Sequence, residues 1–167
     1  MMPEDERHDK AVKILLELAR TYKPYGEVSA YKSRDYKKIS IISSHKRGKV
    51  VGYPYYPDLW CKYTRSNKLD IFEVWNKQND DACVDDIVLA ALTPNVQSLY
   101  IVCLEKSKHE LAQILVKVIL SSLFNEKKKY LLDPSEVMRH VKLIPNEILK
   151  DDCKMREFLH DELEFAQ

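Results

Sequence analysis

The chain has 167 residues, of which 45% are hydrophobic and 32% are charged, and its net charge is +1. This length fits one domain, and the composition is that of a globular protein rather than of a disordered one. The charged N-terminus lacks the apolar stretch of a signal peptide, and the apolar run at 111–123 is too polar for a membrane span. We therefore expect a cytoplasmic protein that does not enter a membrane.

Three further site classes are excluded by cysteine and glycine usage. The four cysteines are scattered with no CxxC pair, so neither a zinc site nor a redox dithiol is expected, and we interpret them as structural thiols. Only three glycines occur, and none belongs to a GxGxxG or GxxxxGK[ST] loop that could hold phosphates.

The first half of the chain predicts one helix followed by two hairpins. Apolar residues recur at helical spacing from Ala11 to Tyr22, and Pro24 with Gly26 ends that helix. Short segments rich in β-branched and aromatic residues then predict strands at 38–43 and 49–53, joined by a turn at 45–48. A second antiparallel hairpin is predicted from strands at 58–63 and 69–75.

The second half predicts a crossover unit and a helical tail. A helix at 80–92, a buried strand at 98–104 and an amphipathic helix at 108–125 favour a βαβ-type connection. Asp133 and Pro134 mark the start of another helix, and a last helix starts at Pro145. We expect a small mixed β-sheet flanked by helices over 1–130. A helical extension at 131–167 would pack on this core or form a homodimer.

Charge is unevenly distributed along the chain. The segment 21–68 has eleven Lys and Arg against three acids, whereas 69–98 has one Lys against six acids. Cations that alternate with tyrosines are typical of nucleic-acid binding, because they neutralise phosphates and stack on bases. The alternative is a solvated loop. The candidate nucleic-acid-binding residues are Lys32, Arg34, Lys37, Lys38, Lys46, Arg47 and Lys49.

Two acids are candidates for a metal site. Asp58 follows Pro57, and Glu73 lies fifteen residues later in the next predicted strand. If the two strands are neighbours, these carboxylates can meet and offer oxygen ligands to Mg²⁺, which can activate water for phosphodiester hydrolysis. Residues two apart in a strand share a face, so Trp75 should point the same way as Glu73. The alternative is that Asp58 is a turn residue and Glu73 an exposed charge on an edge strand.

Pro57-Asp58, Glu73-Val74-Trp75 and the order of predicted elements over 8–125 resemble the restriction-endonuclease-like PD-(D/E)xK nucleases. The resemblance implies Asp58 and Glu73 as catalytic metal ligands for Mg²⁺ or Mn²⁺. It also implies an acid on the first helix, which would be Glu17 or Glu6. The family's lysine, two residues after the Glu, is replaced by Trp75.

Lys77 or Lys62 could stand in for the missing lysine, because both lie on a matching strand face. With such a lysine, the resemblance implies a metal-dependent nuclease that acts on DNA or RNA. Without one, it implies a non-catalytic nucleic-acid-binding or protein-assembly module.

Overall fold

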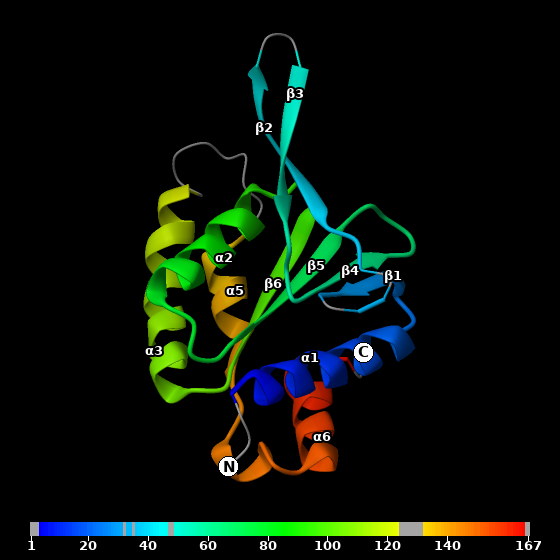
Figure 1. Cartoon of the computed structure of the whole chain (residues 1–167), viewed down its shortest axis with the longest axis vertical. Helices are drawn as coiled ribbons and strands as arrows, with labels where there is room; N and C mark the ends of the chain where they lie inside the picture. The colour runs from blue at the N-terminus through cyan, green and yellow to red at the C-terminus, as the bar shows by residue number, and fades with distance from the viewer. Residues whose placement is uncertain (1–3, 32, 35, 47–48, 124–131, 166–167) are drawn as a thin grey trace.

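A five-stranded mixed sheet lies between two layers of helices (Figure 1). This computed structural model describes residues 4–31, 33–34, 36–46, 49–123 and 132–165. The strands, in spatial order, are β1 (Tyr25–Ala30), β4 (Leu59–Tyr63), β5 (Leu69–Trp75), β6 (Val96–Cys103) and β7 (Val141–Leu143). The pairs β1–β4 and β4–β5 are antiparallel, whereas β5–β6 and β6–β7 are parallel. The predicted α/β class, with a mixed sheet flanked by helices, is confirmed.

The helices divide between the two faces of the sheet, and each face has its own apolar core. On one face lie α1 (Glu4–Thr21) and α6 (Asp152–Glu162). The other face is covered by α2 (Asp80–Leu92), α3 (Lys106–Leu115), its π-helical continuation η1 (Val116–Leu120) and α5 (Pro134–Arg139). No helix within the described ranges is both long enough and apolar enough to cross a membrane. The cysteines Cys61, Cys83 and Cys103 are buried in these cores, whereas Cys153 is exposed.

The first predicted hairpin forms a separate two-stranded sheet that projects from the main one (Figure 1). Its strands are β2 (Ile39–Lys46) and β3 (Lys49–Tyr55). The prediction that the turn starts at His45 is wrong, because His45 pairs with Val50 as part of the ladder. At the base of the hairpin, Ile39 and Tyr55 pack into the core shared with α2, so the hairpin is anchored where it leaves the sheet.

Two strands were not predicted, and the tail is more divided than expected. β1 contains Gly26 and β7 has only three residues, so neither has a clear alternating pattern. The tail begins with the predicted Asp133 cap, whose side chain accepts a hydrogen bond from the Ser135 amide. The predicted last helix is instead a short 3₁₀ turn, η2 (Asn146–Ile148), followed by α6, which packs on α1. Dimerisation through these helices stays a prediction.

Candidate functional site

The antiparallel register of β4 and β5 brings Asp58 and Glu73 together. Leu59 pairs with Phe72, so the preceding and following residues, Asp58 and Glu73, face each other one step further along. The Oδ2 atom of Asp58 accepts a hydrogen bond of 2.8 Å from the amide of Val74. The alternative of an exposed edge-strand charge is wrong for Glu73, because β5 is a central strand and the residue is only 3% exposed.

Glu73 is enclosed from the hairpin side by Tyr55. The phenol of Tyr55, itself buried, donates a hydrogen bond of 2.7 Å to Oε1 of Glu73. Burial raises the pKa of Glu73 well above its ordinary value, and the neighbouring charges of Asp86 and Asp58 raise it further. The protonated carboxyl is therefore the favoured form of Glu73 in this site.

Trp75 lies two residues after Glu73, at the position where the PD-(D/E)xK pattern has a lysine. Its side chain shares a face with Glu73, as strand alternation predicts, and is fully buried under α2. The indole N–H donates a hydrogen bond of 2.9 Å to Oδ2 of Asp86 on α2. Burial, and then the charge of Asp58, raise the pKa of Asp86 to about 7. Asp86 is therefore a third acid of the site, and the only sequence signal for it was its place in the acidic segment 69–98.

The first helix contributes a histidine, His8, and an acid, Asp9, to the site. Nε2 of His8 lies 3.1 Å from Oδ1 of Asp58. The preceding residue, Arg7, fixes the start of α1 here, because its guanidinium bonds Asn76 at 3.1 Å and Glu105 at 2.7 Å. Burial lowers the pKa of His8, but the hydrogen bonds and charges of Asp58 and Asp9 together outweigh this effect, and the pKa is raised. A His8–Asp58 ion pair is thus favoured.

His8, Asp9, Asp58, Glu73 and Asp86 line a cleft of about 500 Å³ at the end of β5. The predicted substitute Lys77 is among its lining residues. Lys62 is not, because it lies further along β4, opposite Glu27 of β1. The expectation for Glu17 is wrong, since its carboxylate pairs with Arg156 of α6, away from the cleft. Glu6 is exposed and does not line the cleft either.

Binding of Mg²⁺ or Mn²⁺ by Asp58 and Glu73 stays a prediction. Across the described part of the chain, no group of three or more His, Cys, Asp or Glu side chains is arranged to hold a metal. Both Asp58 oxygens have partners, in the Val74 amide and His8, and Oε1 of Glu73 accepts the Tyr55 proton. A divalent cation that used these carboxylate oxygens would have to replace their present partners.

An aromatic cluster lies at the rim of the cleft. Tyr31 and Tyr56 are 46% and 51% exposed, with ring centroids 6.4 Å apart. Tyr36 contacts both rings, at 5.4 Å from Tyr31 and 6.1 Å from Tyr56. The amide of Tyr31 donates a hydrogen bond of 2.8 Å to the carbonyl of Asp58, so the cluster is attached directly to the acidic site.

Three cations lie on the same segment of the chain as Tyr31 and Tyr36. The carbonyl of Lys37 accepts a hydrogen bond of 2.6 Å from the buried Trp60 indole, and its amide donates one of 2.8 Å to Ser29. These bonds fix the main chain while the side chains of Arg34, Lys37 and Lys38 stay exposed.

Two of the remaining predicted cations, Lys46 and Lys49, belong to the β2–β3 hairpin. Lys46 and Lys49 face each other as the last described pair of the hairpin. The predicted binding residues Lys32 and Arg47 lie outside the described residues.

Comparison of the chain with protein-family models, curated proteins and solved structures finds no match.

Proposed function

We propose that the chain is a non-catalytic nucleic-acid-binding module on a restriction-endonuclease-like scaffold. The observation that carries this proposal is the exposed pair Tyr31 and Tyr56 beside exposed Lys37 and Lys38, on a main chain fixed by buried groups. Lys and Arg neutralise phosphates with release of counterions, and tyrosine rings stack on bases. Stacking on these rings requires unpaired bases, so single strands are the preferred ligand.

The electrostatics of the cleft are compatible with a polyanion at its rim. Four carboxylates at full charge, those of Asp9, Asp58, Glu73 and Asp86, would repel phosphates from Tyr31 and Tyr56. The raised pKa of Glu73 favours its protonated form, and the raised pKa of His8 favours a positive charge beside Asp58, so both reduce this repulsion. Asp86, with a pKa of about 7, adds negative charge as the pH rises. We therefore expect nucleic-acid binding to weaken above neutral pH.

Hydrolysis has little support in the same cleft. An indole cannot place a positive charge beside an attacking water, and Trp75 is held in the core by its hydrogen bond to Asp86. The protonation of Glu73 and the partners of Asp58 oppose joint binding of a cation by these two side chains. These contacts favour a structural role for the acids.

The test is fluorescence anisotropy with labelled single-stranded and duplex oligonucleotides across a salt series. The Lys37→Ala/Lys38→Ala variant should weaken single-strand binding by about tenfold and flatten the salt dependence by about two charges. Lys117→Ala/Lys150→Ala removes the same charge from exposed positions elsewhere and should leave binding unchanged. Equal losses in both double variants, or binding that ignores salt, would overturn the proposal.

The contribution of stacking is tested separately. Tyr56→Ala should cost about 1–3 kcal/mol in binding free energy for single strands and little for duplexes, whereas Tyr56→Phe should retain most of the affinity. If Tyr56→Phe weakens binding as much as Tyr56→Ala, the phenol hydroxyl rather than the ring face makes the contact. That result would refute stacking.

A metal-dependent nuclease is the second candidate, because Asp58 and Glu73 do converge at the cleft. Its test is cleavage of labelled DNA and RNA in Mg²⁺ or Mn²⁺. Cleavage that disappears in both Asp58→Ala and Glu73→Ala would establish this function and refute the non-catalytic proposal. Cleavage that persists in both variants would indicate a contaminating enzyme.

A further inference from the structure

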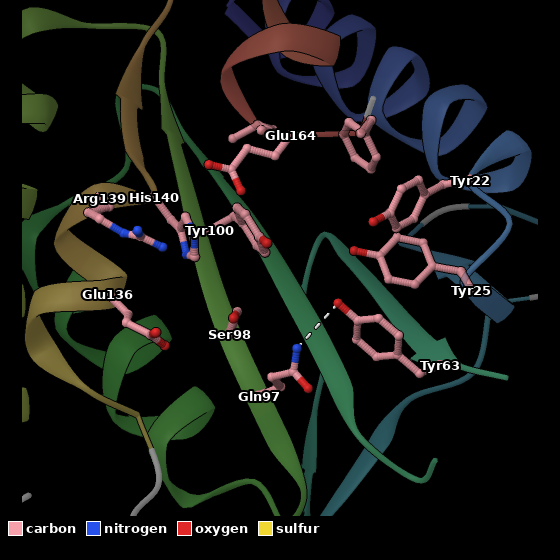
Figure 2. A pocket seen from close by; sticks show the side chains of 12 residues that line it. Tyr22, Tyr25, Tyr63, Gln97, Ser98, Tyr100, Glu136, Arg139, His140 and Glu164 are labelled. Carbon is pink, nitrogen blue, oxygen red and sulfur yellow. Dashed lines mark hydrogen bonds between the residues drawn. The ribbon is translucent and has the colours of Figure 1, made fainter. Parts of the chain in front are cut away.

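A second pocket, of about 350 Å³, lies at the opposite end of β5 from the acidic cleft. It opens on the α1–α6 face of the sheet, and polar groups from several elements point into it (Figure 2). Tyrosines 22, 25 and 63 line one side, and Glu164 and Arg139 lie across from them. Nothing in the proposed nucleic-acid surface involves these residues.

A buried carboxylate lies behind the tyrosines. Asp70, in β5, is 0% exposed, and the phenols of Tyr25 and Tyr63 donate hydrogen bonds of 2.7 Å and 2.6 Å to its Oδ2 atom. Its Oδ1 atom has no hydrogen-bond partner, and no cation contributes to its environment among the described residues. Burying a carboxylate without a cation is costly, so a positive charge near Asp70 would stabilise this site.

The hydrogen bonds to Asp70 determine which role the phenols of Tyr25 and Tyr63 can take toward the pocket. A phenol has one proton, and in Tyr25 and Tyr63 that proton is used by Asp70. Their oxygens can therefore only accept hydrogen bonds from the pocket side. Tyr63 already accepts a long one, 3.4 Å, from Gln97 (Figure 2). A ligand at this end must be a donor.

The residues that line the pocket also favour a positively charged ligand. Among the described lining residues, Glu136 and Glu164 are opposed by one cation, Arg139. Burial, with help from the charge of Arg139, lowers the pKa of His140 to about 4 and keeps that side chain neutral. The buried Nδ1 atom of His140 also has no partner. Counting Asp70 behind the wall, the pocket is net negative, which suits a cation.

We propose that this pocket binds a small organic cation through a primary ammonium group. The ammonium protons would be donated to the Tyr25 and Tyr63 oxygens, with Asp70 supplying the opposing charge through the phenols. The ring of Tyr22 lies beside that of Tyr25, and the carboxylate of Glu164 lies across from them (Figure 2). Aromatic faces attract cations, which adds to the selectivity for positive charge.

Glu164, which lines this pocket, has a left-handed backbone conformation. Its φ is 60°, in the left-handed region that favours glycine at the C-terminal end of a helix, and it directly follows the C-cap of α6. A glutamate at this position places a carboxylate at the pocket, which glycine could not do. The pocket therefore retains an acid where the local backbone would favour another residue.

The experiment is isothermal titration of the full chain with putrescine, 1,4-butanediol and succinate, which have similar lengths but differ in charge. Of these three compounds, only putrescine should bind. A lysine amide acetylated at its α-amino group, which keeps the side-chain ammonium, should show whether a lysine side chain can replace the free diamine. Asp70→Asn keeps the acceptor for the phenols and should weaken putrescine binding at least about tenfold. Glu164→Gln should weaken it by a smaller factor.

The control is Glu147→Gln, which removes an exposed charge outside the pocket and should leave affinity unchanged. Should Asp70→Asn fail to fold by circular dichroism, Glu164→Gln against Glu147→Gln still decides the question, because both positions are exposed. Equal binding of butanediol or succinate, no binding of putrescine, or equal losses in the two glutamine variants would overturn the proposal.

Discussion

Asp86→Asn should stabilise the protein at neutral pH and have little effect in acid. The amide oxygen of asparagine can still accept the hydrogen bond from Trp75, so the packing under α2 is preserved. What the substitution removes is a carboxyl whose pKa is raised to about 7 in the folded chain, by burial and by the charge of Asp58. The effect therefore isolates the electrostatic cost of Asp86.

The magnitude follows from proton linkage. The ordinary pKa of the aspartate is 3.8, so between that pH and about 7 the unfolded chain releases a proton that the folded chain keeps. Stability then falls as pH rises, by about 1.4 kcal/mol per pH unit, which sums to about 4 kcal/mol. Asp86 is partly exposed, and solvent screening reduces this to about 2 kcal/mol.

Urea unfolding followed by circular dichroism at pH 4, 5, 6, 7 and 8 measures the difference between the two proteins. Asp86→Asn should match the native chain near pH 4, gain stability steadily, and level off above pH 7 with about 2 kcal/mol more. A difference that is constant with pH, or that favours the native chain at pH 8, would refute the placement of a protonated Asp86 in this site.

Three further results are expected. Trp75→Phe should lower the free energy of unfolding by about 2–4 kcal/mol in urea titrations, because it leaves a cavity and removes the donor to Asp86; a loss below about 1 kcal/mol would contradict the burial of the indole. Glu164→Gly should raise the thermal midpoint, with a gain of about 1 kcal/mol, and no gain would argue against the left-handed backbone there. The anisotropy of a bound single strand should fall between pH 6 and pH 8 in the native chain, but not in Asp86→Asn; parallel pH profiles would exclude Asp86 as the cause.

The acidic cleft and the rim cluster are coupled through the main chain. The amide of Tyr31 binds the carbonyl of Asp58, whose side chain in turn bonds Val74 and His8. These contacts fix the position of Tyr31, one of the residues that we propose contact the nucleic acid. This gives the acids a physical role that does not require hydrolysis.

Local patterning by itself determined much of this protein. Strand alternation and the short link between 63 and 69 gave the β4–β5 hairpin, and the hairpin in turn predicted that Asp58 meets Glu73 and that Trp75 shares its face. The cap and proline at 133–134 gave the start of α5, and the apolar run at 98–104 gave a central strand. These features depend on residues close together in the chain.

Only the tertiary structure decided which distant side chains complete each site. Helical periodicity shows which face of α1 is buried but not how that helix is placed along the sheet, so His8 rather than Glu17 meets Asp58. Asp86 and Trp75 come together because α2 packs on β5. The second pocket is formed by residues of β1, β4, β6 and α5 together with residues 163–165. Its geometry therefore depends on how whole elements pack rather than on any local pattern.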